Sequence, residues 1–360
     1  MRKFLTYIAV LSVVAAEAQY KPVTIPGSET RFIQSAIVQG QEYELQVLLP
    51  SNYTKSKKQY PVVYLMDAQW DFPLVKSIYG QIYYDGFIPE LIIVGVTWGG
   101  KNPNPDSLRA RDYTPTREGR LIQSGGADKF LSFMKEELFP FMEKNYRVSQ
   151  NERILMGCSL GGLFSIYTML THTEMFTGYA AASPAISWDN YVLSKYEKAF
   201  AEKKINTPVR LYMTVGDVER GKTGFENMAA YLINKHYPNV SIRSKVLENT
   251  GHSGTKSETY TRGLQYIFER QTLSFTTEQL KKYAGTYQIS NGGTVELKAE
   301  ADGLYWYNNP QNKFKLFANT SHHFYAAHEF FNLYFQLNQD VVEGFYWERF
   351  GGNQFLKKIK

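Results

Sequence analysis

The amino-acid sequence predicts an α/β domain with a mostly parallel central sheet, followed by a small, barrel-like all-β domain. Three observations carry this prediction. Short apolar runs alternate with segments long enough for helices between residues 43 and 270, which is typical of a parallel sheet flanked by helices. One of these runs leads directly into a Gly-x-Ser-x-Gly motif. From about Phe275 onward, short alternating segments are separated by turn residues, which is typical of an all-β domain.

The predicted strands of the first domain differ in how apolar they are. Residues 61–66 and 91–96 are continuous apolar runs, as expected for parallel strands buried on both faces, whereas residues 43–49 alternate. Three strands therefore precede the Gly-x-Ser-x-Gly motif, and four follow it or lead into it. The full set of predicted strands is 43–49, 61–66, 91–96, 153–156, 179–183, 208–215 and 241–247.

Two helices are predicted with some precision. Apolar side chains at Phe130, Met134, Leu138 and Phe141 share one face of a helix over residues 127–146, with charged residues opposite. Residues 260–270 are predicted to form a closing helix. The second domain contains seven predicted strands, at 285–288, 294–298, 303–307, 313–317, 323–326, 332–337 and 344–349.

Residues 1–18 have the pattern of a signal peptide. Arg2 and Lys3 precede an apolar run that ends in Ala16-Glu17-Ala18, and this run is shorter than the roughly 20 residues that span a bilayer. We therefore expect cleavage before Gln19, a secreted or periplasmic protein, and no integral membrane segment after removal of the signal. The expected division is residues 1–18 as signal peptide, 19–273 as the α/β domain and 274–360 as the all-β domain.

Composition narrows the function. Of 360 residues, 43% are hydrophobic and 21% are charged, which is ordinary for a globular protein. The formal net charge is +6, but the basic residues are scattered and do not form the patch that nucleic-acid binding needs. The single cysteine, Cys158, excludes an intramolecular disulfide and is interpreted as a small buried apolar residue. The sequence predicts no metal or other cofactor, and it leaves the oligomeric state open.

The Gly-x-Ser-x-Gly motif predicts a nucleophile. A serine hydroxyl is a weak nucleophile, so it must be exposed beside a base and near backbone donors that receive the developing oxyanion. A nucleophile elbow provides this, because a strand turns sharply into a helix and the serine at the tip takes a strained conformation. Gly157 and Gly161 leave room for the close approach of strand and helix. We therefore predict Ser159 as nucleophile and the N–H of Leu160 as one oxyanion donor.

The base and the acid are expected after the serine, in loops that follow later strands. His252 follows strand 241–247 and is the only one of six histidines in such a position, so it is the predicted base. Strand 208–215 is followed by both Asp217 and Glu219. The acid holds the imidazole tautomer and stabilises its cation. We predict Glu219 for this role, with Asp217 as the alternative.

Two further groups of residues are candidates for the site. The second oxyanion donor is expected in the loop after strand 61–66, where the N–H of Ala68 or Gln69 fits. Substrate-binding candidates are taken from the polar stretch before residue 127 and from the segment after strand 179–183, because aromatic and charged side chains there can line a pocket. These candidates are Arg111, Asp112, Tyr113 and Trp188.

Together these motifs resemble the putative esterase family of α/β-hydrolases, also called esterase D-like, over about residues 30–270. The resemblance rests on residues 60–67, 111–115, 157–162 and 183–188, and on Gly251-His252. It implies an α/β-hydrolase fold and catalytic roles for Ser159 and His252. In several members the acid lies three residues after the glycine that matches Gly216, which favours Glu219. The family includes feruloyl esterases and siderophore esterases. In the siderophore esterases a Ser–His dyad without an acid is sufficient for catalysis.

The second domain resembles, more weakly, the lipocalin-like β domain appended to some secreted serine hydrolases, through residues 280–287 and 302–304. We interpret it as a stabilising module, with glycan or substrate binding as the alternative. The sequence thus predicts a secreted serine esterase that acts through an acyl-enzyme on a small-molecule or glycan-linked ester. Two alternatives stay open: an acyltransferase of the same fold, and a non-catalytic glycan-binding protein.

Overall fold

A computed structural model describes residues 24–309, 311–349 and 352–360, so the predicted signal peptide lies outside the described residues. The first domain is built on an eight-stranded sheet with strand order β1-β2-β4-β3-β5-β6-β7-β8. Strands β1 and β2 are antiparallel to their neighbours, and all strands from β4 to β8 in this order are parallel. The bounds are β1 Ser28–Gln34, β2 Glu42–Leu48, β3 Tyr60–Leu65, β4 Ile92–Trp98, β5 Val148–Cys158, β6 Gly178–Ala182, β7 Val209–Gly216 and β8 Val240–Leu247.

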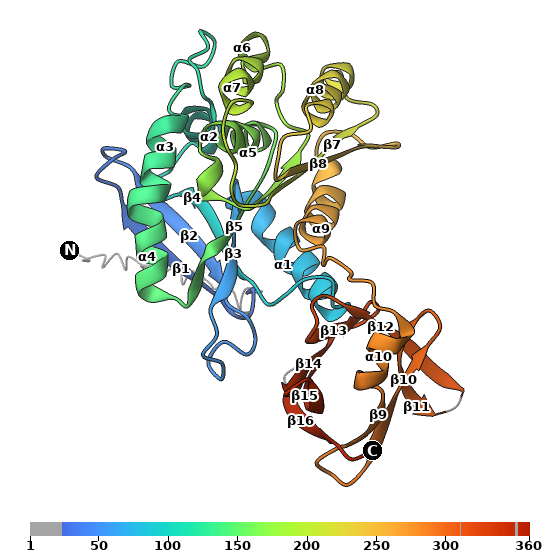
Figure 1. The fold of residues 1–360 in the computed structure, drawn as a ribbon. Helices are drawn as coiled ribbons and strands as arrows, with labels where there is room; N and C mark the ends of the chain where they lie inside the picture. The colour runs from blue at the N-terminus through green and yellow to red at the C-terminus, as the bar shows by residue number, and fades with distance from the viewer. Residues whose placement is uncertain (1–23, 310, 350–351) are drawn as a thin grey trace, which may run out of the picture.

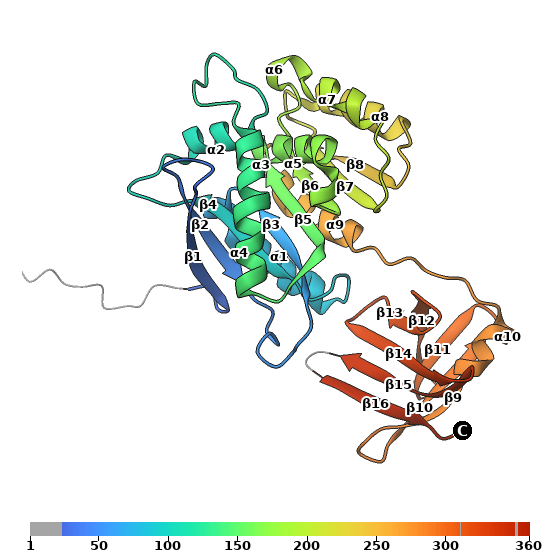
Figure 2. The same cartoon turned by 60° about the vertical axis from the view of Figure 1, so that its left-hand side comes forward.

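Helices cover both faces of this sheet (Figures 1 and 2). One face packs against α1 (Ala68–Tyr84) and α9 (Thr255–Ile267). The opposite face carries the remaining helices, which are α2 Pro105–Tyr113, α3 Ala127–Phe133, the π-helical turn η1 Met134–Leu138, α4 Phe139–Asn145, α5 Leu160–Thr171, the 3-10 turn η2 Thr173–Met175, α6 Trp188–Tyr191, α7 Leu193–Phe200 and α8 Lys222–Asn234.

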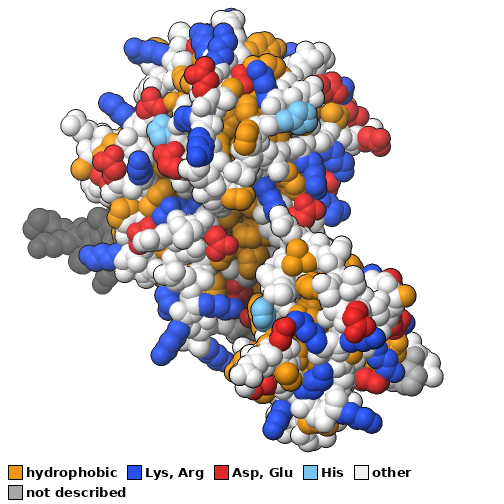
Figure 3. Space-filling model, viewed as in Figure 1, with side chains coloured by type: hydrophobic (Ala, Val, Ile, Leu, Met, Phe, Trp, Pro, Cys, Tyr) orange, Lys and Arg blue, Asp and Glu red, His pale blue; other side chains and the backbone are white. Residues whose placement is uncertain are grey.

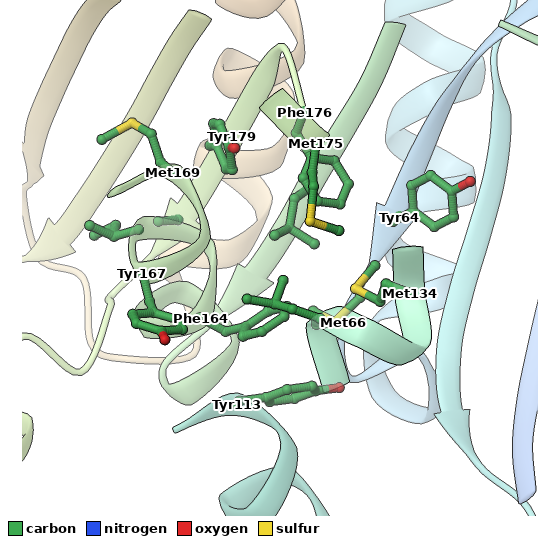
Figure 4. Packing of buried hydrophobic residues seen from close by; sticks show 14 of the residues in the cluster. Tyr64, Met66, Tyr113, Met134, Phe164, Tyr167, Met169, Met175, Phe176 and Tyr179 are labelled. Carbon is green, nitrogen blue, oxygen red and sulfur yellow. The ribbon is translucent and has the colours of Figure 1, made fainter. Parts of the chain in front are cut away.

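Burial explains why the central strands are so apolar. Every residue of β3, β4 and β6 is buried, because helices cover both sides of the sheet centre. The larger core, between the sheet and α5, contains aromatic and methionine side chains that interlock (Figure 4). Tyr113, Phe164 and Tyr64 belong to it, and the Tyr113 and Phe164 ring centroids are 5.6 Å apart. Such packing fixes α2 and α5, which border the site described below.

The second domain is a closed barrel of eight antiparallel strands in the order β10-β11-β12-β13-β14-β15-β16-β9. A short α10 (Thr277–Leu280) and the 3-10 turn η3 (Lys281–Tyr283) precede it. Its interior is filled by apolar side chains, including Trp306, Phe345 and Tyr287, each at most 2% exposed. The strands are β9 Gly285–Gln288, β10 Thr294–Glu300, β11 Gly303–Asn309, β12 Asn312–Ala318, β13 His323–Ala326, β14 Phe331–Asn338, β15 Val341–Arg349 and β16 Gly352–Lys358.

The predicted fold class is confirmed, with four differences in the elements. Strand β1 was not expected, so four strands and not three precede the elbow, and β16 was not expected in the barrel. The helix predicted over 127–146 contains the π-helical turn η1 between α3 and α4. The closing helix, predicted from residue 260, begins at Thr255. For the two helices, the apolar pattern that supported the prediction is present but does not mark where the helix begins or changes its turn.

The barrel lies at the amino edge of the parallel strands. Helix α1 begins directly after the carboxyl end of β3 and spans 17 residues, or about 25 Å, before its end meets the barrel (Figure 1). The Arg270 guanidinium donates to Gly86 O and to Asn332 Oδ1, both at 3.0 Å, and Lys58 pairs with Glu348 at 3.1 Å. Figure 3 shows the narrow waist where the two domains meet. The barrel therefore does not line the carboxyl edge of the sheet.

Candidate active site

Four neighbouring parallel strands each deliver one residue to the carboxyl edge of the sheet. Ser159 follows β5, Ser183 follows β6, Glu219 follows β7 and His252 follows β8. Because the carboxyl ends of parallel strands meet at one edge, residues that are 93 positions apart in the sequence are brought together here. The sequence placed three of these four residues in this site and missed Ser183.

Ser159 has the geometry of a nucleophile elbow. Its φ is 59° and its ψ is −115°, a conformation that only a surrounding structure can maintain for a non-glycine residue. The Ser159 N–H donates to Ala182 O at 2.9 Å, and the N–H of Leu163 donates to Ser159 O at 2.9 Å. A Cβ atom on Gly157 would lie 2.6 Å from the carbonyl carbon of Gly161. The turn therefore requires glycine at position 157, as the motif predicted.

Glu219 is the carboxylate that contacts the histidine. Its Oε2 lies 2.7 Å from His252 Nδ1, and its Oε1 accepts the Gly216 N–H at 2.8 Å and the Ser183 hydroxyl at 2.6 Å. Burial raises the pKa of Glu219, but the hydrogen bonds from Ser183, His252 and Gly216 outweigh it, so the net pKa lies below the ordinary value of 4.5. Glu219 is thus held as an ionised acceptor for the Nδ1–H of His252.

Asp217, the alternative acid, lies in the same turn but faces elsewhere. Its Oδ1 accepts the Thr250 N–H at 3.1 Å, and backbone hydrogen bonds from Thr250 and Asn249 lower its pKa. Among the described residues, no hydrogen bond joins Asp217 to His252. The geometry therefore favours Glu219 and gives Asp217 the role of fixing the loop that carries the histidine.

The reactive atoms face outward from this arrangement. Within the described part of the chain, neither the Ser159 hydroxyl nor His252 Nε2 has a hydrogen-bond partner. The His252 side chain is 49% exposed, whereas its partner Glu219 is 13% exposed. Glu219 therefore orients the imidazole through Nδ1 and leaves Nε2 open, while the hydrogen bond between Nε2 and Ser159 Oγ that general-base catalysis uses is not formed in the structure described.

Backbone donors flank Ser159 on two helices. Leu160 begins α5 and Ala68 begins α1, and the N–H groups of Leu160, Ala68 and Gln69 donate no hydrogen bond among the residues that the structure describes. Free N–H groups at helix N-termini favour negative charge. Strands β3 and β5 are neighbours, and a Cβ on Gly161 would lie 3.4 Å from Asp67 Oδ2, so the two helix starts are close together.

An ion pair beneath this edge was not predicted. Arg109 donates to both oxygens of Asp67, at 3.0 and 2.7 Å, and its Nη2 also lies 3.3 Å from Cys158 O. Burial lowers the pKa of Arg109, but the hydrogen bond and the charge of the Asp67 carboxylate raise it by more, so the net pKa lies above its ordinary value. Arg109 thus joins α2 to both loops that flank Ser159. Trp70, half exposed, has its ring 5.7 Å from the Arg109 guanidinium.

The four predicted substrate-binding residues have mainly internal contacts. Asp112 is 1% exposed and accepts hydrogen bonds from Tyr43, Trp98 and Arg111. Tyr113 is fully buried, and its Oη accepts the Asp67 N–H at 3.2 Å. The Trp188 indole donates to Thr116 at 3.1 Å. Asp112, Tyr113 and Trp188 therefore support the loops around the site, and Arg111, whose side chain is 25% exposed, pairs with Asp112 at 2.6 Å. Substrate contact by these four residues stays a prediction.

The Cys158 thiol, next to Ser159 in the sequence, is buried. Burial raises the pKa of the Cys158 thiol to about 12, so it stays protonated and is a poor nucleophile.

Residues 24–309, 311–349 and 352–360 contain no group of three or more His, Cys, Asp or Glu side chains arranged to hold a metal ion. In the same residues, no helix combines the length and apolar character that crossing a bilayer requires.

Comparison with known proteins gives matches for both domains. A family model described as "Putative esterase" matches residues 35–285, and one described as a domain of unknown function (DUF3471) matches residues 270–357. The ferri-bacillibactin esterase BesA of Bacillus subtilis (strain 168) is 31% identical over 215 residues, which cover 55% of this chain and 72% of the relative.

Two more distant proteins agree with this match. The siderophore triacetylfusarinine C esterase of Aspergillus fumigatus is 28% identical over 189 residues, covering 51% of this chain and 64% of the relative. The crystal structure of the BES protein from Bacillus cereus superposes with a TM-score of 0.62 at 24% identity, covering 70% of this chain and 98% of that one. The latter shows that the α/β domain shares its fold.

Proposed function

The chain belongs to the putative esterase family and is a carboxylic ester hydrolase, and from this premise we propose that it acts as a serine esterase with a Ser159–His252–Glu219 triad. One observation carries the proposal: the 2.7 Å contact between Glu219 Oε2 and His252 Nδ1, in a loop at the same sheet edge as the strained Ser159. It supports a base whose tautomer leaves Nε2 free to accept the serine proton.

The proposed first half-reaction forms an acyl-enzyme. Ser159 Oγ attacks the ester carbonyl carbon while His252 Nε2 takes the hydroxyl proton. The N–H of Leu160 and the N–H of Ala68 or Gln69 donate to the developing oxyanion, and among the described residues no protein acceptor competes for them. The ester C–O bond then breaks, and His252 returns the proton to the leaving alkoxide.

The second half-reaction releases the acid. Water attacks the acyl carbon and gives a proton to His252 Nε2, a second oxyanion forms on the same donors, and the bond to Ser159 Oγ breaks as the proton returns to it. Glu219 stays ionised throughout and stabilises the imidazolium that forms twice per turnover. The lowered pKa of Glu219 supports this role.

For the substrate we propose a siderophore ester. Two relatives are named for hydrolysis of such compounds, and one of them is 31% identical to this chain. Half-exposed Trp70, beside the Arg109 guanidinium, offers an aromatic surface next to the oxyanion donors for a bulky, ring-bearing substrate. We further propose that residues 1–18 direct export and that the barrel stabilises the catalytic domain from the amino edge.

The test uses residues 19–360 with nitrophenyl acetate, followed by a catecholate siderophore trilactone, a feruloyl sugar ester and an acetylated xylan fragment. We expect ester hydrolysis that Ser159→Ala abolishes while its circular dichroism spectrum stays unchanged. Mass spectrometry of the enzyme quenched with a slow ester should place the acyl group on Ser159. Full activity of Ser159→Ala would overturn the triad, and a preference for the xylan or feruloyl ester would overturn the substrate proposal alone.

A further inference from the structure

The buried Ser183 hydroxyl contacts the same carboxylate that orients the histidine. Ser183 is 3% exposed, and its Oγ lies 2.6 Å from Glu219 Oε1, the oxygen that His252 does not use. The same Oγ lies 2.8 Å from Thr255 Oγ1, and Thr255 Oγ1 in turn lies 2.8 Å from the carbonyl oxygen of His252. These contacts join the acid, the backbone of the base and the start of α9 in one hydrogen-bonded group.

The number of protons fixes the direction of these bonds. An ionised carboxylate only accepts, so the single Ser183 proton is donated to Glu219. Ser183 Oγ can therefore meet Thr255 only as an acceptor, and the Thr255 proton is directed to Ser183 or to the His252 carbonyl. A hydrogen bond to a charged group is stronger than one between neutral groups. The Ser183–Glu219 bond is therefore the strongest of the group.

The Ser183 backbone is held in an unfavourable conformation. Its φ is 39°, a left-handed value, and it precedes Pro184, although a residue before proline favours extended backbone. The Ser183 N–H donates to Thr214 O at 2.9 Å and fixes this conformation. Strain of this kind persists where the surrounding structure maintains it, and it concentrates at functional sites.

We propose that Ser183 is a positioning residue for the triad acid. The Ser183 hydroxyl and the Gly216 N–H both donate hydrogen bonds to Glu219 Oε1. These two bonds keep Oε2 aligned with His252 Nδ1 and keep the carboxylate ionised. Ser183 does not contact the ester, and it acts on catalysis only through Glu219. This inference rests on the proposed triad function and adds a fourth strand end, that of β6, to the machinery.

The test is a double-mutant cycle on steady-state ester hydrolysis. Ser183→Ala should lower kcat about tenfold, at the lower end for loss of a hydrogen bond to a charged group, with KM changed less than twofold. In a Glu219→Ala background the same substitution should change kcat less than twofold, because the carboxylate oxygen that accepts the Ser183 hydroxyl is absent. Ser165→Ala is the matched control, because Ser165 is also buried beside the elbow but bonds only to Gly161 O. It should leave kcat unchanged.

A second variant separates the hydroxyl from the strain. Ser183→Gly also lacks the hydroxyl, but glycine accepts a φ of 39° without cost, so this variant should fold and lose the same activity as Ser183→Ala. Wild-type kcat in Ser183→Gly, or equal losses from Ser183→Ala with and without Glu219→Ala, would overturn the positioning role. Activity that survives Ser159→Ala would instead overturn the triad itself, so the two failures are distinguishable.

Discussion

The Lys256 ammonium lies 2.6 Å from the Asp71 carboxylate and joins α9 to α1. Asp71 is 3% exposed and also accepts the Tyr260 hydroxyl at 2.8 Å. Lys256 lies four residues after His252, and Asp71 lies two residues after Gln69. This pair, whose carboxylate is buried, therefore joins the helix that follows the base to the helix that carries the predicted second oxyanion donor.

Removing one partner of this pair should destabilise the protein strongly. Lys256→Met leaves the Asp71 carboxylate buried without its cation, for which about 3 kcal/mol in the free energy of unfolding is expected. Lys245→Met is the control, because the Lys245–Glu258 pair also joins α9 to a neighbouring element, the strand β8, but its lysine is 55% exposed, so the pair should contribute less than about 1 kcal/mol. Urea unfolding of both variants measures the difference. Equal losses would show that the Lys256–Asp71 pair has no special role.

The docking of the barrel should depend on a glycine at the end of α1. Gly86 has a φ of 77°, and a Cβ there would overlap the backbone of Glu329 in the barrel domain. Gly40 has the same φ but no atom within 4 Å of its would-be Cβ, so Gly40→Ala measures the backbone strain alone, about 1–2 kcal/mol. Gly86→Ala should cost clearly more and make residues 268–276 susceptible to limited proteolysis. A cost that matches Gly40→Ala, with no new cleavage, would contradict a tight junction.

Cys158 offers a direct test of the burial of the elbow. It is the only cysteine in the chain, it is 3% exposed, and burial raises its pKa to about 12. The native protein should therefore react with Ellman's reagent only as fast as it unfolds, while the protein in urea reacts at once. Cys158→Ala should keep esterase activity. Rapid labelling at neutral pH, or loss of activity in this variant at unchanged stability, would assign a chemical role to the thiol.

The strands of the sheet centre and the elbow could be predicted because each carries its signal locally. β3 and β4 are buried throughout and read as continuous apolar runs, and the elbow is a motif of five residues. β1 could not be predicted in this way, because it is an edge strand whose residues are mostly exposed or half-buried and show no apolar alternation. β16 likewise consists mainly of polar residues.

Pairs that are distant in the sequence explain what was missed in the site. Arg109 and Asp67 are 42 positions apart, and Ser183 and Glu219 are 36 apart, so no local pattern connects them. Asp217 and Glu219 lie in one turn, and only its backbone course decides which carboxylate faces His252. Asp112 was predicted to bind substrate because polar residues in loops often do, but its three donors are brought together only by the folded core.

The ionised Glu219 should give the protein a measurable pH dependence of stability. Burial raises the pKa of Glu219, but its hydrogen bonds lower it further, to below the 4.5 of an unfolded chain. A group with a lowered folded-state pKa stabilises the protein fully above its unfolded-state pKa and loses this contribution as pH falls through its folded-state pKa.

The variant Glu219→Gln cannot ionise at this position, so the wild type should have a larger free energy of unfolding than this variant at pH 7. The difference should shrink steadily below about pH 4.5. Urea unfolding at pH 7, 5, 4 and 3 measures this difference, and one that stays constant across this range would contradict an ionised, hydrogen-bonded Glu219.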